Sequence, residues 1–300
     1  MPRSKKFDLN RIATATGLTE IQISRKRIAT ETLKEIYDDY LSNKPMLLET
    51  QQEIIDELNK KVMPFCHSIR SRLKDPDHLI AKLIRNAEKK GGKYLTIDQE
   101  NYLSRINDLI GVRIVVLRQK DSKAVHDAIL SLYENDREKY VSPECDYDEN
   151  IKKFDGSYIA EEPIVYITAE SDRKFYENAK GLRIADSKKE YRSTHYIVRK
   201  GDVFFEIQVR TLFEEGWLEF DHAIKYPNDN DNPKKADFLR ILNGLAHASD
   251  ELISFYDTLE PFMNKKKSTG NDIQDNTSIN NEVSTQANGK KLNDKILEQF

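Results

Sequence analysis

Apolar residues recur at helical spacing near the start of the chain, over residues 21–40 and again over residues 47–62. This period gathers the apolar side chains on one face of each segment, which predicts two amphipathic helices. Asn43, Lys44 and Pro45 stand between the segments, and proline interrupts a helix because it has no backbone N–H. The pattern therefore predicts a pair of helices with a break between them.

Two strand-helix units are predicted next. Residues 67–74 alternate as an extended strand does, and Asp75 and Pro76 then suit the N-cap and first position of a helix. That helix is predicted to run to residue 90, because two glycines follow it. Residues 110–117 predict a buried strand, and the following helix is expected to begin at Asp121 or Ser122.

The clearest hairpin lies further along the chain. Residues 191–199 and 203–210 are β-rich and flank Lys200-Gly201-Asp202, a turn-forming tripeptide. Before it, residues 142–162 predict a loop and residues 164–168 a short strand. After it, helices are predicted over residues 212–226 and 234–263, with a turn-rich connection.

These segments predict an α/β (α+β) fold, in which helices flank a mixed sheet. Residues 268–289 are polar and poor in large apolar side chains, which predicts a disordered C-terminal tail. Ile296 and Leu297, near the end, could seed a short docking helix.

The composition narrows the class of protein. Of the 300 residues, 38% are hydrophobic and 33% charged, and the formal net charge of −3 excludes a strongly basic protein held on nucleic acid by general electrostatics. Any site for a polyanion must therefore be local. Cys66 and Cys145 offer neither a disulfide framework nor a zinc site, and we find no signal peptide and no membrane span. We expect a soluble cytoplasmic protein.

The hairpin carries the first candidate chemistry. Alternate side chains of a strand share a face, so Glu206, Gln208 and Arg210 lie on one side of its second strand. Tyr191, Ser193 and His195 share a face of the preceding strand, and antiparallel pairing brings them near the row that contains Glu206. A solvated outer face of an amphipathic sheet would show the same pattern.

Carboxylates and cations suggest a phosphate site. Asp108 lies just before the strand at residue 110, and together with Glu206 it would supply the oxygen ligands that Mg²⁺ prefers. Taken alone, Asp108 would be an ordinary turn residue. Four cations converge near the start of one helix and could neutralise a transferred pyrophosphate, although an exposed basic helix face would look similar. They are Arg72, Lys74, Lys82 and Arg85.

Four motifs in order, spread over about residues 50–260, resemble the RelA/SpoT synthetase family. They are Arg72-Leu73-Lys74 with Lys82, Asp108-Leu109-Ile110-Gly111-Val112-Arg113, Tyr191-Arg192-Ser193-Thr194-His195-Tyr196, and Glu206-Ile207-Gln208-Val209-Arg210-Thr211. Residues 217–222 also look like the helix that follows in this family. Two departures are His78, where serine is usual, and Lys189-Glu190, where an Asn-Gly pair is common.

The resemblance implies a nucleotidyltransferase-like sheet and an ATP-dependent pyrophosphokinase that acts on GDP or GTP. In that family Asp108 and Glu206 would hold Mg²⁺, with Glu206 as a possible base. The ATP-binding set would be Arg72, Lys74, Lys82, Arg85 and Arg113. The acceptor-binding set would be Tyr191, which stacks on guanine, with His195, Gln208 and Arg210.

The expected organisation follows from the same resemblance. We predict an N-terminal helical extension (1–45), a synthetase domain (46–263) and a mostly disordered tail (264–300). Too few residues precede Arg72 for the hydrolase domain of the long members, and His126-Asp127 is not placed as its metal-binding pair, so we expect a small synthetase-only member. Small members tend to form homo-oligomers.

Two alternatives stay open. Some small members resemble this chain and pyrophosphorylate the 3′ end of tRNA, so the acceptor could be tRNA rather than a nucleotide. A catalytically silent nucleotide- or RNA-binding module is the alternative of another class. The pair Asp108 and Glu206 argues against it, because a binding module has no need of two metal carboxylates.

Overall fold

The computed structural model describes residues 6–87, 94–140, 156–187, 191–225 and 232–268. By its contacts the chain divides into two units, residues 1–256 and residues 257–300, and the fold and site belong to the first. The predicted domain boundaries after residues 45 and 263 stay predictions. No helix in the described part is long and apolar enough to cross a membrane.

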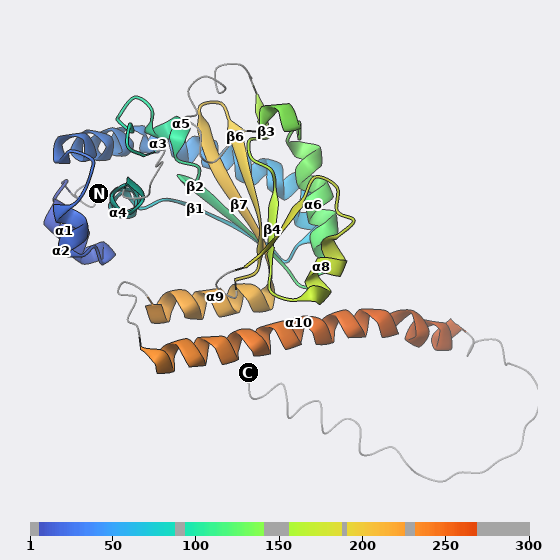
Figure 1. Ribbon diagram of the computed structural model, residues 1–300. Helices are drawn as coiled ribbons and strands as arrows, with labels where there is room; N and C mark the ends of the chain where they lie inside the picture. Colours follow the sequence, from blue (N-terminus) through green and yellow to red (C-terminus); the bar gives the residue numbers. More distant parts are fainter. Residues whose placement is uncertain (1–5, 88–93, 141–155, 188–190, 226–231, 269–300) are drawn as a thin grey trace, which may run out of the picture. The chain divides into compact units, whose positions relative to one another are not determined.

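A mixed seven-stranded sheet forms the centre of the first unit (Figure 1). Its strands are β1 (Ser68–Leu73), β2 (Ile110–Val116), β3 (Ser157–Ile159), β4 (Ile164–Ile167), β5 (Arg183–Asp186), β6 (Ser193–Lys200) and β7 (Val203–Thr211). They lie in the order β1-β2-β7-β6-β4-β5, with β3 paired to β6. The pairs β2·β7 and β4·β5 are parallel, and the others are antiparallel. The predicted mixed sheet flanked by helices is confirmed.

The helices and helical turns are distributed along the whole described chain. They are α1 (Leu9–Thr16), α2 (Glu20–Ser24), α3 (Thr30–Lys61), the 3₁₀ turn η1 (Met63–Phe65), α4 (Pro76–Ala87), α5 (Tyr102–Arg105), α6 (Asp121–Leu132), the 3₁₀ turn η2 (Arg137–Lys139), α8 (Glu170–Tyr176), α9 (Leu212–Lys225) and α10 (Pro233–Ser268).

The two faces of the sheet differ in chemistry. One face packs against α3 and α6 through apolar side chains such as Val112, Ile207 and Val209. Gln51 of α3 reaches Ser71 of β1 at 2.7 Å, and His126 of α6 reaches the hydroxyl of Tyr196 at 2.9 Å, so both helices lie on this apolar face. The opposite face carries the polar side chains and is approached by α9. This asymmetry leaves one face of the sheet for chemistry.

The predicted pair of N-terminal helices is wrong. Helix α3 runs without interruption from Thr30 to Lys61 with Pro45 inside it, whereas residues 20–24 form the separate short helix α2. A proline inside a helix costs roughly 3 kcal/mol. The buried stripe of α3 continues on both sides of Pro45, from Leu33 to Leu58, and its burial outweighs that local cost.

Most elements near the site are confirmed. The predicted strand over residues 67–74 is β1, and Asp75 caps α4 by accepting from the backbone N–H groups of Asp77 and His78 at 2.9 and 3.4 Å. The predicted end of that helix at residue 90 lies outside the described residues. The hairpin β6–β7 turns at Gly201, whose φ of 59° is left-handed and suits glycine.

One loop prediction is wrong in part. Residues 157–159, inside the segment predicted as a loop, form β3 because they add to the edge of β6. The rest of that loop up to residue 155, the predicted tail beyond residue 268 and the Ile296-Leu297 segment lie outside the described residues. Helix α8 and strand β5 carry no clear period in the sequence and were not expected.

Candidate functional site

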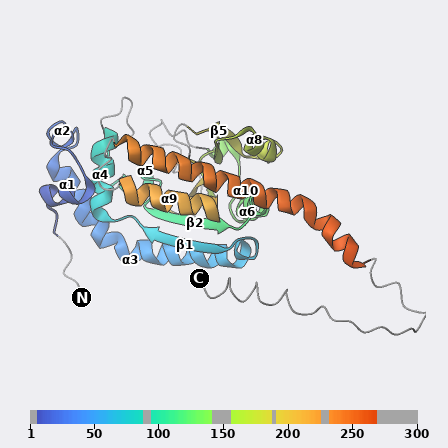
Figure 2. The same ribbon diagram turned by 90° about the horizontal axis from the view of Figure 1, so that it is seen from below.

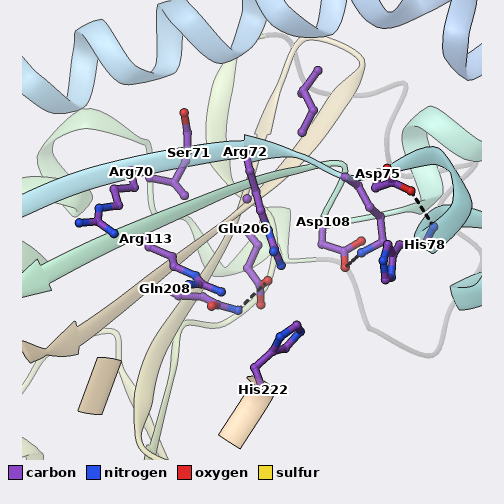
Figure 3. Close-up of a pocket in the computed structure, with 14 residues that line it drawn as sticks. Arg70, Ser71, Arg72, Asp75, His78, Asp108, Arg113, Glu206, Gln208 and His222 are labelled. Carbon is purple, nitrogen blue, oxygen red and sulfur yellow. Dashed lines mark hydrogen bonds and ion pairs between the residues drawn. The ribbon is translucent and has the colours of Figure 1, made fainter. Parts of the chain in front are cut away.

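A cavity of about 520 Å³ opens on the polar face of the sheet, where β1, β2 and β7 run side by side. Side chains from these strands, from the start of α4 and from α9 converge on it, whereas the Ser71 side chain points away toward α3 (Figure 3). Its polar lining residues are Arg70, Ser71, Arg72, Lys74, Asp75, His78, Asp108, Arg113, Glu206, Gln208 and His222. The lining therefore combines three carboxylates with four lysine and arginine side chains.

The strand register explains why these residues meet. Arg72 of β1 pairs with Gly111 of β2, which in turn pairs with Glu206 of β7, so all three lie in one row across the sheet. Arg70, Arg113 and Gln208 form the next row on the same face. Because Gly111 has no side chain, the floor between Arg72 and Glu206 stays open.

Asp108 sits at one end of the cavity between two lysines. Lys74 and Lys82 each donate to one oxygen of its carboxylate, at 2.7 Å in both cases. Burial alone would raise the pKa of Asp108, but the charges of Lys82 and Lys74 outweigh it, so the pKa lies below its ordinary value. Asp108 is therefore a charged, partly buried carboxylate, and the two predicted phosphate-binding lysines are beside it.

Glu206 lies in the same cavity and is held from β6 and β7. Nδ1 of His195 lies 2.8 Å from one carboxylate oxygen, and Nε2 of Gln208 donates to the other at 2.9 Å. Burial opposes the charge of Glu206, but the contacts with His195 and Gln208 prevail and lower its pKa. The negative charge of Asp108 raises the pKa of Glu206, which shows that the two carboxylates are close enough to repel one another.

The predicted acceptor residues continue this network along the polar face. The hydroxyl of Tyr191 lies 2.8 Å from Nε2 of His195, and Arg210 donates to that hydroxyl at 2.5 Å. Arg210 also donates to Oε1 of Gln208 at 2.5 Å. The structure thus joins Tyr191, His195, Glu206, Gln208 and Arg210 into one hydrogen-bonded chain.

Helix α9 fixes the two arginines of this face. Arg113 and Arg210 each donate to Glu215 of α9 at 2.9 Å, one to each carboxylate oxygen, and Arg113 also binds Glu219. Burial works against the charge of Arg113, but Glu215 and Glu219 raise its pKa above the ordinary value. Arg113 reaches the cavity from β2, whereas Arg210 stands further along β7 beside Tyr191.

Arg85 is placed differently from the other predicted cations. Its guanidinium donates to the backbone carbonyl of Thr16 in α1 at 2.5 Å. Neither Arg85 nor Lys82 lines the cavity, but Lys82 binds Asp108, which does. The charge of Arg85 still affects His78. Burial lowers the pKa of His78, and the charges of Lys74, Arg85 and Arg72 lower it further, whereas the charge of Asp75 raises it. The predicted role of Arg85 toward ATP stays a prediction.

Sequence reasoning missed several residues of the site. Arg70 is two residues before Arg72, and the alternation of the predicted strand could have placed it on the same face. His222 and Glu215 approach from α9, and only the packing of that helix over β2 and β7 brings them to the site. Tyr166 of β4 packs edge-on against the ring of His195 with centroids 5.2 Å apart. No pattern in the sequence pairs β4 with β6.

The donor set fits a hard divalent cation such as Mg²⁺. Asp108 and Glu206 offer charged oxygens in one cavity, and no cluster of three or more His, Cys, Asp or Glu residues that could hold a metal occurs among the described residues. Mg²⁺ commonly uses one or two carboxylates together with substrate phosphates and water, whereas a zinc site would need a fuller set of nitrogen or sulfur ligands.

The structure is thus an α/β protein with a mixed sheet and a charged cavity on one face of that sheet. A sequence model described as "Region found in RelA / SpoT proteins" matches residues 71–231, which is more than half of the chain and includes every residue that lines the cavity except Arg70. The chain therefore belongs to the RelA/SpoT family. No curated protein matches this chain significantly.

Several solved structures resemble the fold at low sequence identity. Small alarmone synthetase 1 from Bacillus subtilis bound to its product pppGpp is 15% identical, with a TM-score of 0.46, over 72% of this chain and 97% of that chain. A GTP pyrophosphokinase family protein from Streptococcus pneumoniae is 18% identical, with a TM-score of 0.47, over 81% and 98%. Small alarmone synthetase 2 from Bacillus subtilis is 21% identical, with a TM-score of 0.43, over 72% and 98%.

Proposed function

We propose that this protein is a magnesium-dependent pyrophosphokinase, which transfers the β,γ-pyrophosphate of ATP to the 3′-hydroxyl of GDP or GTP. The product would be guanosine tetra- or pentaphosphate. The observation that carries the proposal is the placement of Asp108 and Glu206 in one cation-lined cavity on the polar face of the sheet. Membership of the RelA/SpoT family supports the same reaction class.

The ATP side of the proposal uses the cationic end of the cavity. Lys74 and Lys82 already hold a carboxylate between them, and their ammonium groups are suited to bind phosphate oxygens in its place. Arg72 and Arg113 also line the cavity. Cations at this position would neutralise the charge that builds up on the transferred pyrophosphate.

The acceptor side uses the network on β6 and β7. The Tyr191 ring would stack on guanine, while His195 would hold the acceptor ribose or phosphate close to Glu206. Arg210 lies over the Tyr191 ring, with its guanidinium carbon 5.2 Å from the centroid, and its bond to the hydroxyl fixes the ring orientation. The edge-on contact with the Tyr166 ring helps to hold the His195 ring in place.

The proposed reaction is a displacement at phosphorus. The 3′-oxygen of the acceptor bonds to the β-phosphorus of ATP, the bond from that phosphorus to the α,β-bridging oxygen breaks, and AMP leaves. The proton of the 3′-hydroxyl goes to Glu206 or, where Glu206 serves as a metal ligand instead, to solvent. Asp108 and Glu206 would hold Mg²⁺, which supplies charge neutralisation at the phosphate oxygens when bound.

Nucleotide turnover separates this proposal from a silent binding module. Purified protein is incubated with ATP and Mg²⁺, with or without GDP or GTP, and the nucleotides are separated by ion-exchange chromatography. The proposal expects AMP to form only when an acceptor is present, in amounts equal to the acceptor consumed. Binding of ATP without AMP formation under any of these conditions would establish the binding-module alternative.

The tRNA alternative is tested by the same approach with a different acceptor. AMP release that depends on tRNA and not on GDP or GTP would keep the chemistry and change the acceptor. The proposal favours the nucleotide because the chain is slightly acidic overall, with a net charge of −3, and the cations of the cavity are committed to the ATP site.

A further inference from the structure

Helix α10 carries a buried aspartate on the face that packs against the body of the first unit. Leu239, Ala246 and Asp250 of this face are buried. The indole N–H of Trp217 in α9 donates to the carbonyl of Leu239 at 2.9 Å. Helix α10 therefore lies beside α9 along residues 239–250, as Figure 2 also shows from below. Burying a carboxylate is costly unless it is paired, so the partners of Asp250 indicate its role.

Asp250 joins the two strands of the hairpin at its open end. One oxygen of its carboxylate, Oδ2, accepts from the guanidinium of Arg192 at 3.1 Å and from the hydroxyl of Thr211 at 2.9 Å. Arg192 directly precedes β6, and Thr211 is the last residue of β7. Each of the three residues is 5% exposed or less, so this bridge lies in the interior of the first unit.

The bridge stands where the backbone ladder of the hairpin ends. The paired register of β6 and β7 runs from the turn to Thr194 and Val209. Arg192 and Thr211 lie two residues beyond this last pair. Side chains therefore connect the strands at this end, and Asp250 supplies the connection from a different element.

The two bridged residues are the immediate neighbours of Tyr191 and Arg210. Tyr191 precedes Arg192 along the chain, Arg210 precedes Thr211, and the Arg210 guanidinium donates to the Tyr191 hydroxyl at 2.5 Å. A change in the spacing of the two strand ends would therefore pass through the backbone to this contact. A displacement of about 1 Å can cost an enzyme about a hundredfold in rate.

The start of α9 makes a second bridge between the same strand ends. Glu214 accepts from the Thr211 N–H at 2.7 Å, and its other carboxylate oxygen lies 3.5 Å from the Arg192 guanidinium. Asp250 lies closer to that guanidinium, at a distance typical of a charge-assisted hydrogen bond. Nδ1 of His247 in α10 is 3.0 Å from Arg192 as well. Helix α10 therefore holds Arg192 through both His247 and Asp250.

We propose that Asp250 is a positioning residue of the acceptor site, which joins the start of β6 to the end of β7 and so sets Tyr191 against Arg210. This role rests on the proposed function, because it takes Tyr191 as the residue that would stack on guanine. Helix α10 begins at Pro233, beyond residue 231, where the match to the family model ends. The acceptor site therefore depends on a residue from outside the matched region.

Steady-state kinetics separates positioning from a general structural role. Asp250→Asn keeps the size of the side chain and removes the charge that holds Arg192. It is expected to raise KM for GDP roughly fivefold to tenfold, while KM for ATP and kcat at saturating GDP stay close to their native values. An unchanged KM for GDP, or an equal rise of both KM values, would overturn the proposal.

Asp237→Asn is the matched control for these measurements. Asp237 is an exposed carboxylate of the same helix and binds Arg240 at 3.3 Å. Its replacement removes the same charge from α10 without touching the bridge between β6 and β7. All three kinetic constants should stay native in this variant.

The single tryptophan of the chain reports whether α10 stays in place, because the Trp217 indole binds the Leu239 carbonyl. The emission of Trp217 should be native in both variants. A shifted emission in Asp250→Asn would overturn the proposal, because Asp250 would then anchor the helix as a whole rather than position the acceptor residues.

A fluorine label tests the position of the Tyr191 ring without any turnover. Fluorotyrosine is incorporated at position 191 of the native chain and of both variants, and the fluorine resonance is recorded in the absence of nucleotide. The resonance is expected to shift or broaden in Asp250→Asn and to stay native in Asp237→Asn. Equal resonances in all three proteins would overturn the positioning role. Absence of AMP formation by the native chain would instead refute the proposed function, so the two failures are distinguishable.

Discussion

Asp108 and Glu206 are the residues on which the proposed chemistry depends. Replacing Asp108 by Asn or Glu206 by Gln keeps the size of each side chain and removes the charge that would hold Mg²⁺. Turnover of ATP with GDP is expected to fall by at least about two orders of magnitude. Asp202→Asn, which alters an exposed carboxylate at the hairpin turn, is the control and should keep normal turnover. Near-normal activity in a folded Asp108 or Glu206 variant would show that the replaced carboxylate does not hold the metal ion.

The lysines around Asp108 lead to a second expectation. Because Lys74 and Lys82 both bind this carboxylate, the protein alone should bind a divalent ion weakly, and the ATP phosphates should release the carboxylate by drawing the lysines away. Lys82→Met should therefore raise the affinity for Mn²⁺ in the absence of nucleotide by about tenfold, a typical coupling between sites.

Electron paramagnetic resonance of Mn²⁺ measures this affinity without any turnover. The double variant Lys82→Met/Asp108→Asn serves as control, since it lacks the carboxylate and should bind no better than the native chain. Equal Mn²⁺ affinity in the native chain and in Lys82→Met would show that the lysines do not compete with the metal.

Tyr191 allows the acceptor side to be tested separately. Tyr191→Ala should weaken binding of the guanosine nucleotide by roughly 1–3 kcal/mol, the range for stacking of a base on an aromatic ring. Tyr191→Phe keeps the ring and loses the contacts of the hydroxyl, among them those with His195 and Arg210, so it should retain most of the affinity. Titration calorimetry with GDP and with an ATP analogue distinguishes the sites. An equal loss for both nucleotides would argue against the stacking role.

At the scale of elements, the start of α9 contains a carboxyl group with an unusual pKa. Thr211 and Glu214 cap this helix reciprocally, with the Thr211 N–H donating to Glu214 at 2.7 Å and the Glu214 N–H donating to the Thr211 hydroxyl at 3.2 Å. Burial raises the pKa of Glu214 to about 7 from 4.5, although Arg192 pulls it down.

The sign of the resulting pH dependence follows from proton uptake. Between about pH 5 and 7 the folded chain keeps a proton on Glu214 that the unfolded chain has lost, so Glu214 lowers stability as pH rises, by at most about 1.4 kcal/mol per pH unit. Glu214→Gln should remove this slope and be more stable than the native chain at pH 8. Urea unfolding at pH 5 and pH 8 measures the difference. A native and a variant chain with the same pH dependence would contradict it.

The elements around the site could be read from the sequence, because each has a local signal. Alternation marks β1 and β7, the Asp75-Pro76 pair marks the start of α4, and Gly201 marks the hairpin turn. The motifs also placed Asp108, Glu206 and His195, since strand faces and antiparallel pairing follow from simple geometry.

What the sequence could not reveal depends on tertiary contacts. Helix α3 passes through Pro45 because a long buried stripe on both sides outweighs the local cost. The short elements β3, α8 and β5 have little period of their own and form where they meet the sheet. Arg85 is a cation of α4, as the sequence predicts, but its guanidinium donates to the backbone carbonyl of Thr16 in α1 instead of pointing into the cavity. Residues of α9 such as His222 come to the cavity only through packing.

At the scale of the whole molecule, net charge bears on the acceptor. A tRNA presents many phosphates, so an enzyme dedicated to it should have an extended basic surface and lose affinity steeply with salt. The chain has a net charge of −3. We therefore expect tRNA to compete poorly with GDP at physiological salt, which inhibition of AMP formation by added tRNA would measure. Effective inhibition at about 0.15 M salt would contradict this expectation.

The transfer of label from γ-labelled ATP is the decisive test of the proposed pyrophosphate transfer. The protein, Mg²⁺ and labelled ATP are mixed with GDP, GTP and tRNA together, and the products are separated by thin-layer chromatography and by gel electrophoresis. We predict that the label moves to GDP or GTP at the 3′ position while unlabelled AMP appears in equal amount. Label on tRNA with none on the guanosine nucleotides, or label that stays on ATP, would contradict the proposed reaction.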